Sequence, residues 1–316
     1  MRDLTRYRTK LVQERSREVN RVQGVLERAN IKLASVATDI MGVSGRAILA
    51  ALIQGRADPA TMAELAKGRM RTKLPQLEQA LTGMMRDHYR RLLTMQLAHI
   101  DFLDEQIDAL STEIAHCVSA LGVDDPSRSL ADTAPLAGET GDLNASGSTP
   151  LSFAHAVTVL DTIPGVDLRG AELLVAEWGT DMRRFGTASR LSAWTGVAPG
   201  NDESAGKQRS GKTRKGNRTL RTGLTQIAHA AARTKGTYLS TLYQRLATRR
   251  GKKRAIMAVA HAIVVSAFHM LSRHEPYREL GANYFDEQRR DHLVDHLTRR
   301  IQRLGYHVHL EPVPAS

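Results

Sequence analysis

The chain has 316 residues, a formal net charge of +12, a pI near 10.1 and a single cysteine, Cys117. One cysteine excludes an intramolecular disulfide framework and a multi-cysteine zinc site, and the absence of an apolar signal core or of an apolar run near about 18 residues argues against membrane insertion. We therefore expect a cytoplasmic protein with no membrane contact, whose excess of positive charge indicates nucleic acid as its partner.

The composition favours helices over β-sandwiches or barrels. Leu, Ala, Arg and Met are abundant, whereas aromatic residues make up only 4% of the chain. The length suggests about two domains. We predict a mainly α protein with a basic, helical and coiled-coil-like region over residues 1–121, a disordered linker over residues 122–150 and a compact helical domain over residues 151–316.

The first predicted element is a long basic helix over residues 2–29. Its apolar residues recur at helical spacing between arginines and lysines. Short helices are expected over residues 40–53 and near residues 60–68, separated by a polar break.

A second long helix is predicted between Met84 and Leu121, where the sequence contains no glycine or proline. Its apolar seam comprises Leu93, Ile100, Phe102, Leu103, Ile107, Leu110, Ile114, Cys117 and Leu121. The heptad-like spacing favours a coiled coil that joins copies of the chain into a homo-oligomer. A bundle helix that packs inside one subunit explains the spacing equally well. Asp101, Asp104, Glu105 and Asp108 flank the seam and are interpreted as a solvated face, not as a metal site.

Residues 122–150 are rich in Gly, Ser, Thr, Asp and Pro, which predicts the linker. After it, the turn at residues 163–166 precedes a helix and resembles a helix-hairpin-helix, whose backbone N–H groups bind phosphate. Asp167 stands where such hairpins usually have a second glycine, and a carboxylate there would oppose phosphate. Phosphate binding and a purely structural turn both remain open.

The strongest signal is the segment PGNDESAGKQRSGKTRKGNR, residues 199–218, which combines glycines with a dense set of cations. Residues 205–254 contain 15 Lys or Arg and no Asp or Glu, so the whole stretch has one sign. We expect an exposed loop that contacts a phosphate backbone, assisted by the RRGKKR run at residues 249–254. The candidate nucleic-acid contacts are Lys207, Arg209, Lys212, Arg214, Lys215, Arg218, Arg249, Arg250, Lys252, Lys253 and Arg254.

Three further helices are predicted in the C-terminal part. One spans about residues 219–234, and another spans residues 253–271 and is apolar nearly all round, which is typical of a core helix. His261 and His269 lie within the second helix and are interpreted as core or groove residues, not as metal ligands. A final amphipathic helix near residues 286–304 leads into a possible strand over residues 306–310.

Taken together, the strings DTIPGV, LSAWTGVAPGN, ESAGKQRSGKTRKGN, RRGKKRAIMAVAHAIV and PYRELGANYFD resemble the C-terminal domain of insertion-sequence transposases of the IS-one-ten family, which are related to the Piv and MooV DNA invertases. The resemblance covers about residues 155–312. The preceding basic and coiled-coil-like region also resembles the middle of these transposases.

The resemblance implies a recombinase with two catalytic parts. One is an N-terminal RNase-H-like domain that holds a divalent metal, expected to be Mg²⁺, on Asp and Glu residues. The other supplies a serine nucleophile from a Ser-small-Gly-Lys string, which here is Ser204-Ala205-Gly206-Lys207. Some members choose their DNA sites with a structured bridge RNA.

This sequence starts after the point where the family's metal-binding residues would occur. It is therefore expected to lack the RNase-H-like domain, to hold no cofactor itself and to be inactive alone. The base that would activate Ser204 is not evident in the sequence.

Other interpretations of the chemistry stay open. Ser210 is the second candidate nucleophile. The chain could also be a nucleic-acid-binding module without catalysis, whose cations neutralise phosphates. Tyrosine recombination would use Tyr238 or Tyr243 with His88 and Arg91, but a suitable set of arginine and histidine around either tyrosine is not evident, and packing explains these residues better.

Overall fold

The computed structural model describes residues 1–55, 58–121 and 150–310, apart from residues 201, 205, 206, 211, 212 and 214; for residues 202–204, 207–210 and 293 it describes the backbone only. The predicted fold class is confirmed, because the described chain is mainly α-helical. Two compact units are present, Met1–Cys117 and Val118–Ser316. Nearly all of the expected linker lies outside the described residues, so the boundaries expected at residues 121 and 151 stay predictions.

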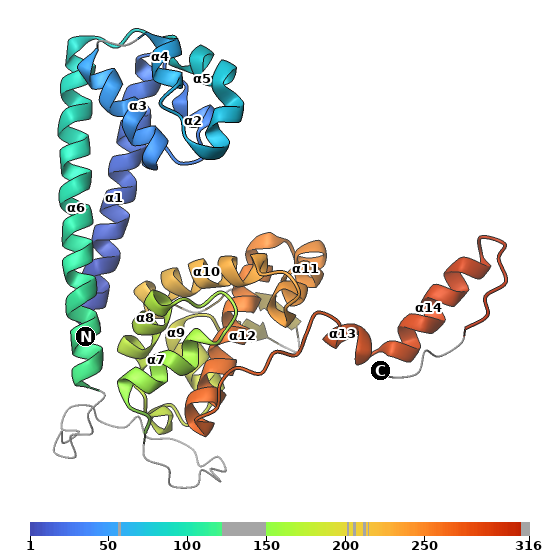
Figure 1. Cartoon of the computed structure of the whole chain (residues 1–316). Coiled ribbons are helices and arrows are strands. Elements are labelled where there is room, and N and C mark those ends of the chain that lie inside the picture. Colours follow the sequence, from blue (N-terminus) through green and yellow to red (C-terminus); the bar gives the residue numbers. More distant parts are fainter. Residues whose placement is uncertain are drawn as a thin grey trace. The chain divides into compact units, whose positions relative to one another are not determined.

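The first unit is built on two long helices, α1 (Arg2–Arg28) and α6 (Asp87–Ala120), which run antiparallel along each other (Figure 1). Between them the chain forms a small helical cluster at one end of the pair. Its elements are α2 (Leu33–Val36), α3 (Val43–Gln54), α4 (Pro59–Ala63), η1 (Gly68–Lys73) and α5 (Leu74–Leu81). The helix expected near residues 60–68 is shorter than predicted, because α4 ends at Ala63 and a 3₁₀ turn follows at Gly68.

The apolar seam of α6 faces the interior of its own unit at Leu93, Ile100, Leu103 and Ile114, all of which are buried. Leu93 and Ile100 join the same core as Val22 of α1. By contrast, Phe102 is 54% exposed, so it does not belong to the buried seam. Burial inside one chain favours the bundle-helix alternative for these positions, and self-association through α6 stays a prediction.

The carboxylates beside this seam pair with cations of the same unit. Asp104 accepts two hydrogen bonds from the Arg15 guanidinium of α1, and this contact raises the pKa of Arg15. Asp101 forms an ion pair with Arg46 of α3 at 2.6 Å. The side chains of Asp101 and Asp104 are still 59% and 39% exposed, which agrees with a solvated face that also pairs with cations of α1 and α3.

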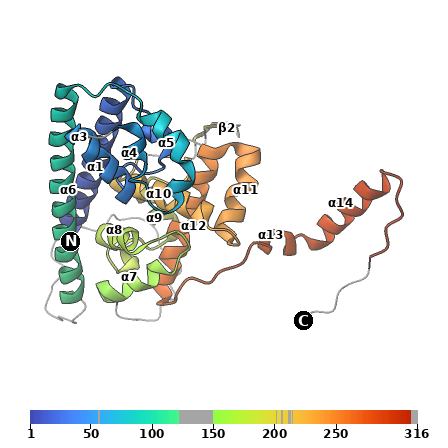
Figure 2. The same cartoon turned by 45° about the horizontal axis from the view of Figure 1, so that its top comes forward.

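The second unit is built around α12 (Lys252–Arg273), whose apolar residues are buried along most of its length. Helices α10 (Arg218–Arg233) and α11 (Tyr238–Arg250) both pack on α12, as both views show (Figures 1 and 2). Helices α7 (Phe153–Asp161), α8 (Leu168–Trp178) and α9 (Ala188–Thr195), with the short η2 (Met182–Arg184), complete the core. The prediction that residues 253–271 form a core helix is thus confirmed.

Helix α12 also corrects the expectation about membrane spans. Among the described residues it is the one helix long and apolar enough to cross a membrane, and 56% of its apolar window is buried inside the structure. Burial of that kind is typical of the core helix of a globular unit.

The chain after α12 differs from the prediction in two places. The expected helix near residues 286–304 is divided into α13 (Tyr284–Glu287) and α14 (Arg290–Gln302), which extend away from the core (Figures 1 and 2). Residues 306–310 form no strand. In the described part of the chain, the apolar alternation of YHVHL finds no neighbouring strand with which to pair, and an isolated strand leaves its backbone groups without ladder partners.

Candidate nucleic-acid interface

The segment that carries the strongest sequence signal contains a β-hairpin. Strand β1 (Asp202–Ser204) pairs antiparallel with β2 (Lys207–Ser210), with a bulge between Asp202 and Glu203. The register places Ser204 opposite Lys207, at the pair of residues that closes the two-residue turn. The expectation of a plain loop is corrected here, and the backbone brings the proposed nucleophile and the proposed phosphate contact to one register position.

The base of this segment is closed by a direct contact between two glycines. A Cβ atom added to Gly216 would lie 2.4 Å from the Cα atom of Gly196, so only glycine allows this approach. Gly196 ends α9 in the left-handed conformation, with φ at 82°. The chain therefore leaves the core at Gly196 and returns to the same point at Gly216, and the described hairpin lies between these two glycines.

Asn217 locks the end of the loop onto the core. Its side-chain carbonyl caps α10 by accepting hydrogen bonds from the backbone N–H groups of Thr219 and Leu220 at 3.0 and 3.2 Å. Its Nδ2 atom donates to Glu177 of α8 at 2.9 Å, and Glu177 is only 2% exposed. Its backbone N–H donates to the Trp194 carbonyl of α9 at 3.3 Å. One asparagine thus ties three helices to the root of the basic loop.

The cations predicted to contact nucleic acid lie in different parts of this segment, and two of them lie outside the described residues. Lys207 and Arg209 lie in β2, whereas Lys212 and Arg214 lie outside the described residues. Lys215 is exposed next to Gly216, and Arg218 is exposed at the first position of α10. The last two cations therefore project from the closed base of the loop.

A second group of cations gathers where α11 ends and α12 begins. Arg249 and Arg250 close α11, Gly251 makes the turn with φ at 83°, and the first turn of α12 carries the remaining three cations; all five are exposed. These three are Lys252, Lys253 and Arg254.

The start of α12 has no side-chain cap and no acidic residue in its first turn. Cations at a helix N-terminus oppose the helix dipole, whereas an anion bound there is favoured by both the dipole and the cations. The arrangement therefore suits a phosphate group at this turn.

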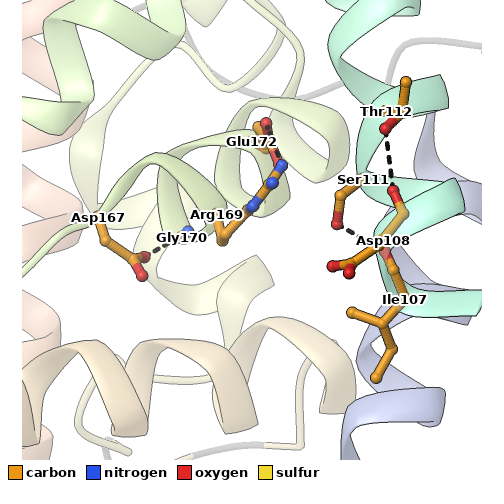
Figure 3. A network of polar contacts seen from close by, with 8 residues as sticks. All are labelled: Ile107, Asp108, Ser111, Thr112, Asp167, Arg169, Gly170 and Glu172. Atoms are coloured by element: carbon orange, nitrogen blue, oxygen red, sulfur yellow. Dashed lines mark hydrogen bonds and ion pairs between the residues drawn. The ribbon is translucent and has the colours of Figure 1, made fainter. Parts of the chain in front are cut away.

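The turn resembling a helix-hairpin-helix has the contacts of a structural turn. Gly165 has φ at 87°, and a Cβ atom there would lie 2.3 Å from the backbone nitrogen of Ala231 in α10. Asp167 caps α8 by accepting from the Gly170 N–H at 2.7 Å, and Arg169 contacts Glu172 one turn later at 3.2 Å (Figure 3). The carboxylate of Asp167 occupies the place that an anion would take at this helix start. These contacts do not support phosphate binding by the turn at residues 163–166, which stays a prediction.

We expect Gly165→Ala to destabilise the second unit by about 3 kcal/mol, because the new methyl group meets the α10 backbone and the residue keeps a positive φ. The matched control is Gly236→Ala, since Gly236 has φ at 77° but nothing within 4 Å of its Cβ position. The control should cost only about 1 kcal/mol, which reflects the backbone conformation alone. Denaturant unfolding followed by circular dichroism measures both. Equal losses in the two variants would contradict the packing of this turn on α10.

Tyr238 has the environment of a packing residue. Its ring stacks on Phe285 with centroids 5.1 Å apart, and its backbone N–H donates to Glu279 at 2.7 Å. Burial raises the pKa of its hydroxyl, with a smaller contribution from Tyr284. His261 is half-buried in α12, where burial lowers its pKa. Both environments agree with packing roles for these residues.

Three residues of this site were not predicted as such from the sequence: Glu177, Asn217 and Trp194. A signal was present for Asn217, since asparagine directly before an expected helix is a preferred N-cap. Glu177 was also visible as an acid inside the apolar run LLVAEW, a position that implies a buried partner. Nothing in the sequence alone paired Glu177 with Asn217, 40 residues away.

The residues around this site are similar to a known family. Residues 157–244 match the model of the Transposase IS116/IS110/IS902 family. No curated protein matches the chain. The matched part spans α8, α9, the hairpin and α10, which are the elements that build the basic loop and its base. This part of the chain is therefore similar to the transposase domain of an insertion-sequence family.

Proposed function

We propose that the protein acts in DNA transposition by cutting and joining DNA strands with Ser204 as the nucleophile. The observation that carries this proposal is the family match over residues 157–244, which includes the hairpin with Ser204 and Lys207 at its closing pair. The stretch that follows Ser204, residues 205–254, contains 15 Lys or Arg and no Asp or Glu, which supports the binding of a phosphate backbone.

In the proposed step, the Ser204 oxygen forms a bond to the phosphorus of a phosphodiester. The bond from phosphorus to one sugar oxygen breaks, and that oxygen leaves as a hydroxyl after taking the proton that the serine gave up. A serine hydroxyl needs a group that accepts this proton, and the negative charge on the nonbridging oxygens needs cations. Lys207 and Arg209 are the proposed cations.

The divalent metal that the resemblance implies has no evident site in the part of the chain that the structure describes. No group of three or more His, Cys, Asp or Glu side chains lies together there in a way that could hold an ion. The nearest candidates from the sequence, Asp101 and Asp104, are paired with arginines. Following the resemblance, we propose that Mg²⁺ is held by an RNase-H-like domain of the kind found in this family, and no step above passes through it.

The remaining partners follow the same proposal. A structured bridge RNA could use the same cations as DNA, since both present phosphates. A homo-oligomer would bring two Ser204 hydroxyls to two strands, as joining requires. The relationship to the Piv and MooV invertases and a cytoplasmic location also belong to the proposal.

The test is to incubate end-labelled DNA with the protein and to separate the products by denaturing electrophoresis. The 316-residue chain alone should bind DNA without cutting it, because the serine lacks its activating partner. Fusion to an RNase-H-like domain of the family should yield a DNA product linked covalently to protein.

Two results would contradict the proposal in different ways. Efficient cutting by the chain alone would contradict the need for a second domain. Binding without any covalent product in the fusion would favour a nucleic-acid-binding module without catalysis.

A further inference from the structure

The inference starts from the two tryptophans of the chain, which have opposite environments. Trp178, at the end of α8, is fully buried in the core of the second unit. Trp194, in the last turn of α9, is 42% exposed. Burial of a large aromatic side chain stabilises a protein strongly, so an indole left in water suggests a contact that this chain alone does not provide.

Trp194 belongs to the root of the basic loop. Its carbonyl oxygen accepts the hydrogen bond from the Asn217 N–H, and the two residues after it meet Gly216 at the loop's closed base. The cations nearest in sequence to that base, Lys215 and Arg218, are both exposed. The indole therefore lies where the proposed phosphate contacts begin.

One side of the Trp194 ring contacts another aromatic residue of the protein. Phe185, which packs against the core, lies with its ring centroid 5.7 Å from that of Trp194, and the two rings are tilted by 57°. Arg184, the last residue of η2 and the neighbour of Phe185, is also exposed. An aromatic side chain held at one edge loses little conformational freedom when a second planar group covers it.

We propose that Trp194 is a stacking platform for an unpaired nucleobase of the strand that the basic loop holds. Cations bind phosphates of paired and unpaired strands alike, whereas an indole face stacks most readily on a base that is not already stacked inside a duplex. The positive field around the root favours an anionic strand over a protein partner, because residues 205–254 contain no acid and 15 cations. This inference rests on the proposed function and adds that the bound strand is opened at this point.

The experiment compares single-stranded DNA, single-stranded RNA and duplex DNA of one length and sequence, at one salt concentration, by the anisotropy of a dye on the nucleic acid. Trp194→Ala should weaken binding of single strands about tenfold, the usual loss for one stacked base, and leave duplex affinity unchanged. Trp194→Phe should keep most of the affinity, since phenylalanine retains a ring. The strand type with the larger loss identifies the base as DNA or RNA.

Intrinsic fluorescence gives a second readout. Single strands should quench the emission of the parent protein, and this quenching should be lost in Trp194→Phe, where only the buried Trp178 remains. The matched control is Phe102→Ala, an exposed aromatic on α6 of the first unit. It should leave the affinity for single strands unchanged.

The outcomes separate this inference from the proposed function. Equal weakening on single strands and duplex, or none on either, would overturn the stacking platform while the basic interface stands. A parent protein that binds none of the three nucleic acids would overturn both.

Discussion

Ser204→Ala should abolish strand transfer when the chain is fused to an RNase-H-like domain, while DNA affinity stays nearly unchanged. Removal of a nucleophile eliminates the covalent step, but it leaves the phosphate contacts of the ground state in place. Lys207→Ala should instead lower both DNA affinity and strand transfer, since its charge attracts the bound phosphate as well as the transition state. Labelled DNA on denaturing gels reports the covalent product, and filter binding reports the affinity.

The matched control for this experiment is Ser210→Ala, a serine at the other end of the same hairpin, where the register sets it opposite Asp202. The proposal expects this variant to retain strand transfer. A covalent product that persists in Ser204→Ala and disappears in Ser210→Ala would move the nucleophile to Ser210.

DNA affinity should fall about a thousandfold between 50 and 200 mM salt, because six or more phosphate contacts release that many counterions from DNA. The basis is the set of exposed cations at the loop root and at the α11–α12 turn. Titrations at four or more salt concentrations measure the slope of log affinity against log salt.

A triple variant tests whether the cations at the start of α12 bind phosphates. Replacing Lys252, Lys253 and Arg254 with alanine should reduce the salt slope by about 2 to 3, roughly one for each phosphate that the variant no longer neutralises. The control replaces Lys10, Arg17 and Arg21 of α1, which removes the same charge from the first unit and should change the slope little. If the DNA affinity of the parent protein hardly changes with salt concentration, phosphate contacts do not account for the binding.

Helices were predictable because their signals are local. The long helices α1, α6, α10 and α12 follow from apolar residues at helical spacing, and α6 and α12 also lie in stretches without glycine or proline. The buried length of α12 was likewise visible as a run that is apolar on all sides. The strand expected at residues 306–310 was wrong, because a strand needs a partner that no local pattern supplies.

The candidate site was predictable as a segment but not as an arrangement. The positions of Ser204 and Lys207 came from a resemblance, and the cations came from counting charge. That Ser204 and Lys207 lie opposite each other in a hairpin depends on the pairing register of the two strands. This register could not be predicted from the local sequence. The proposed stacking role of Trp194 could not be foreseen either, since its exposure was unknown before the structure.

The sequence by itself determined that this protein is mainly helical, that its positive charge is concentrated in residues 205–254, and that this segment resembles a transposase domain. These features depend on residue type and spacing along the chain. Only the tertiary structure decided that Gly165 packs on α10, that Gly216 touches Gly196, and that Asn217 joins α10 to Glu177. The reason is physical: close backbone approach and the pairing of a buried carboxylate depend on which surfaces meet, and distant parts of the chain meet only when the core has formed.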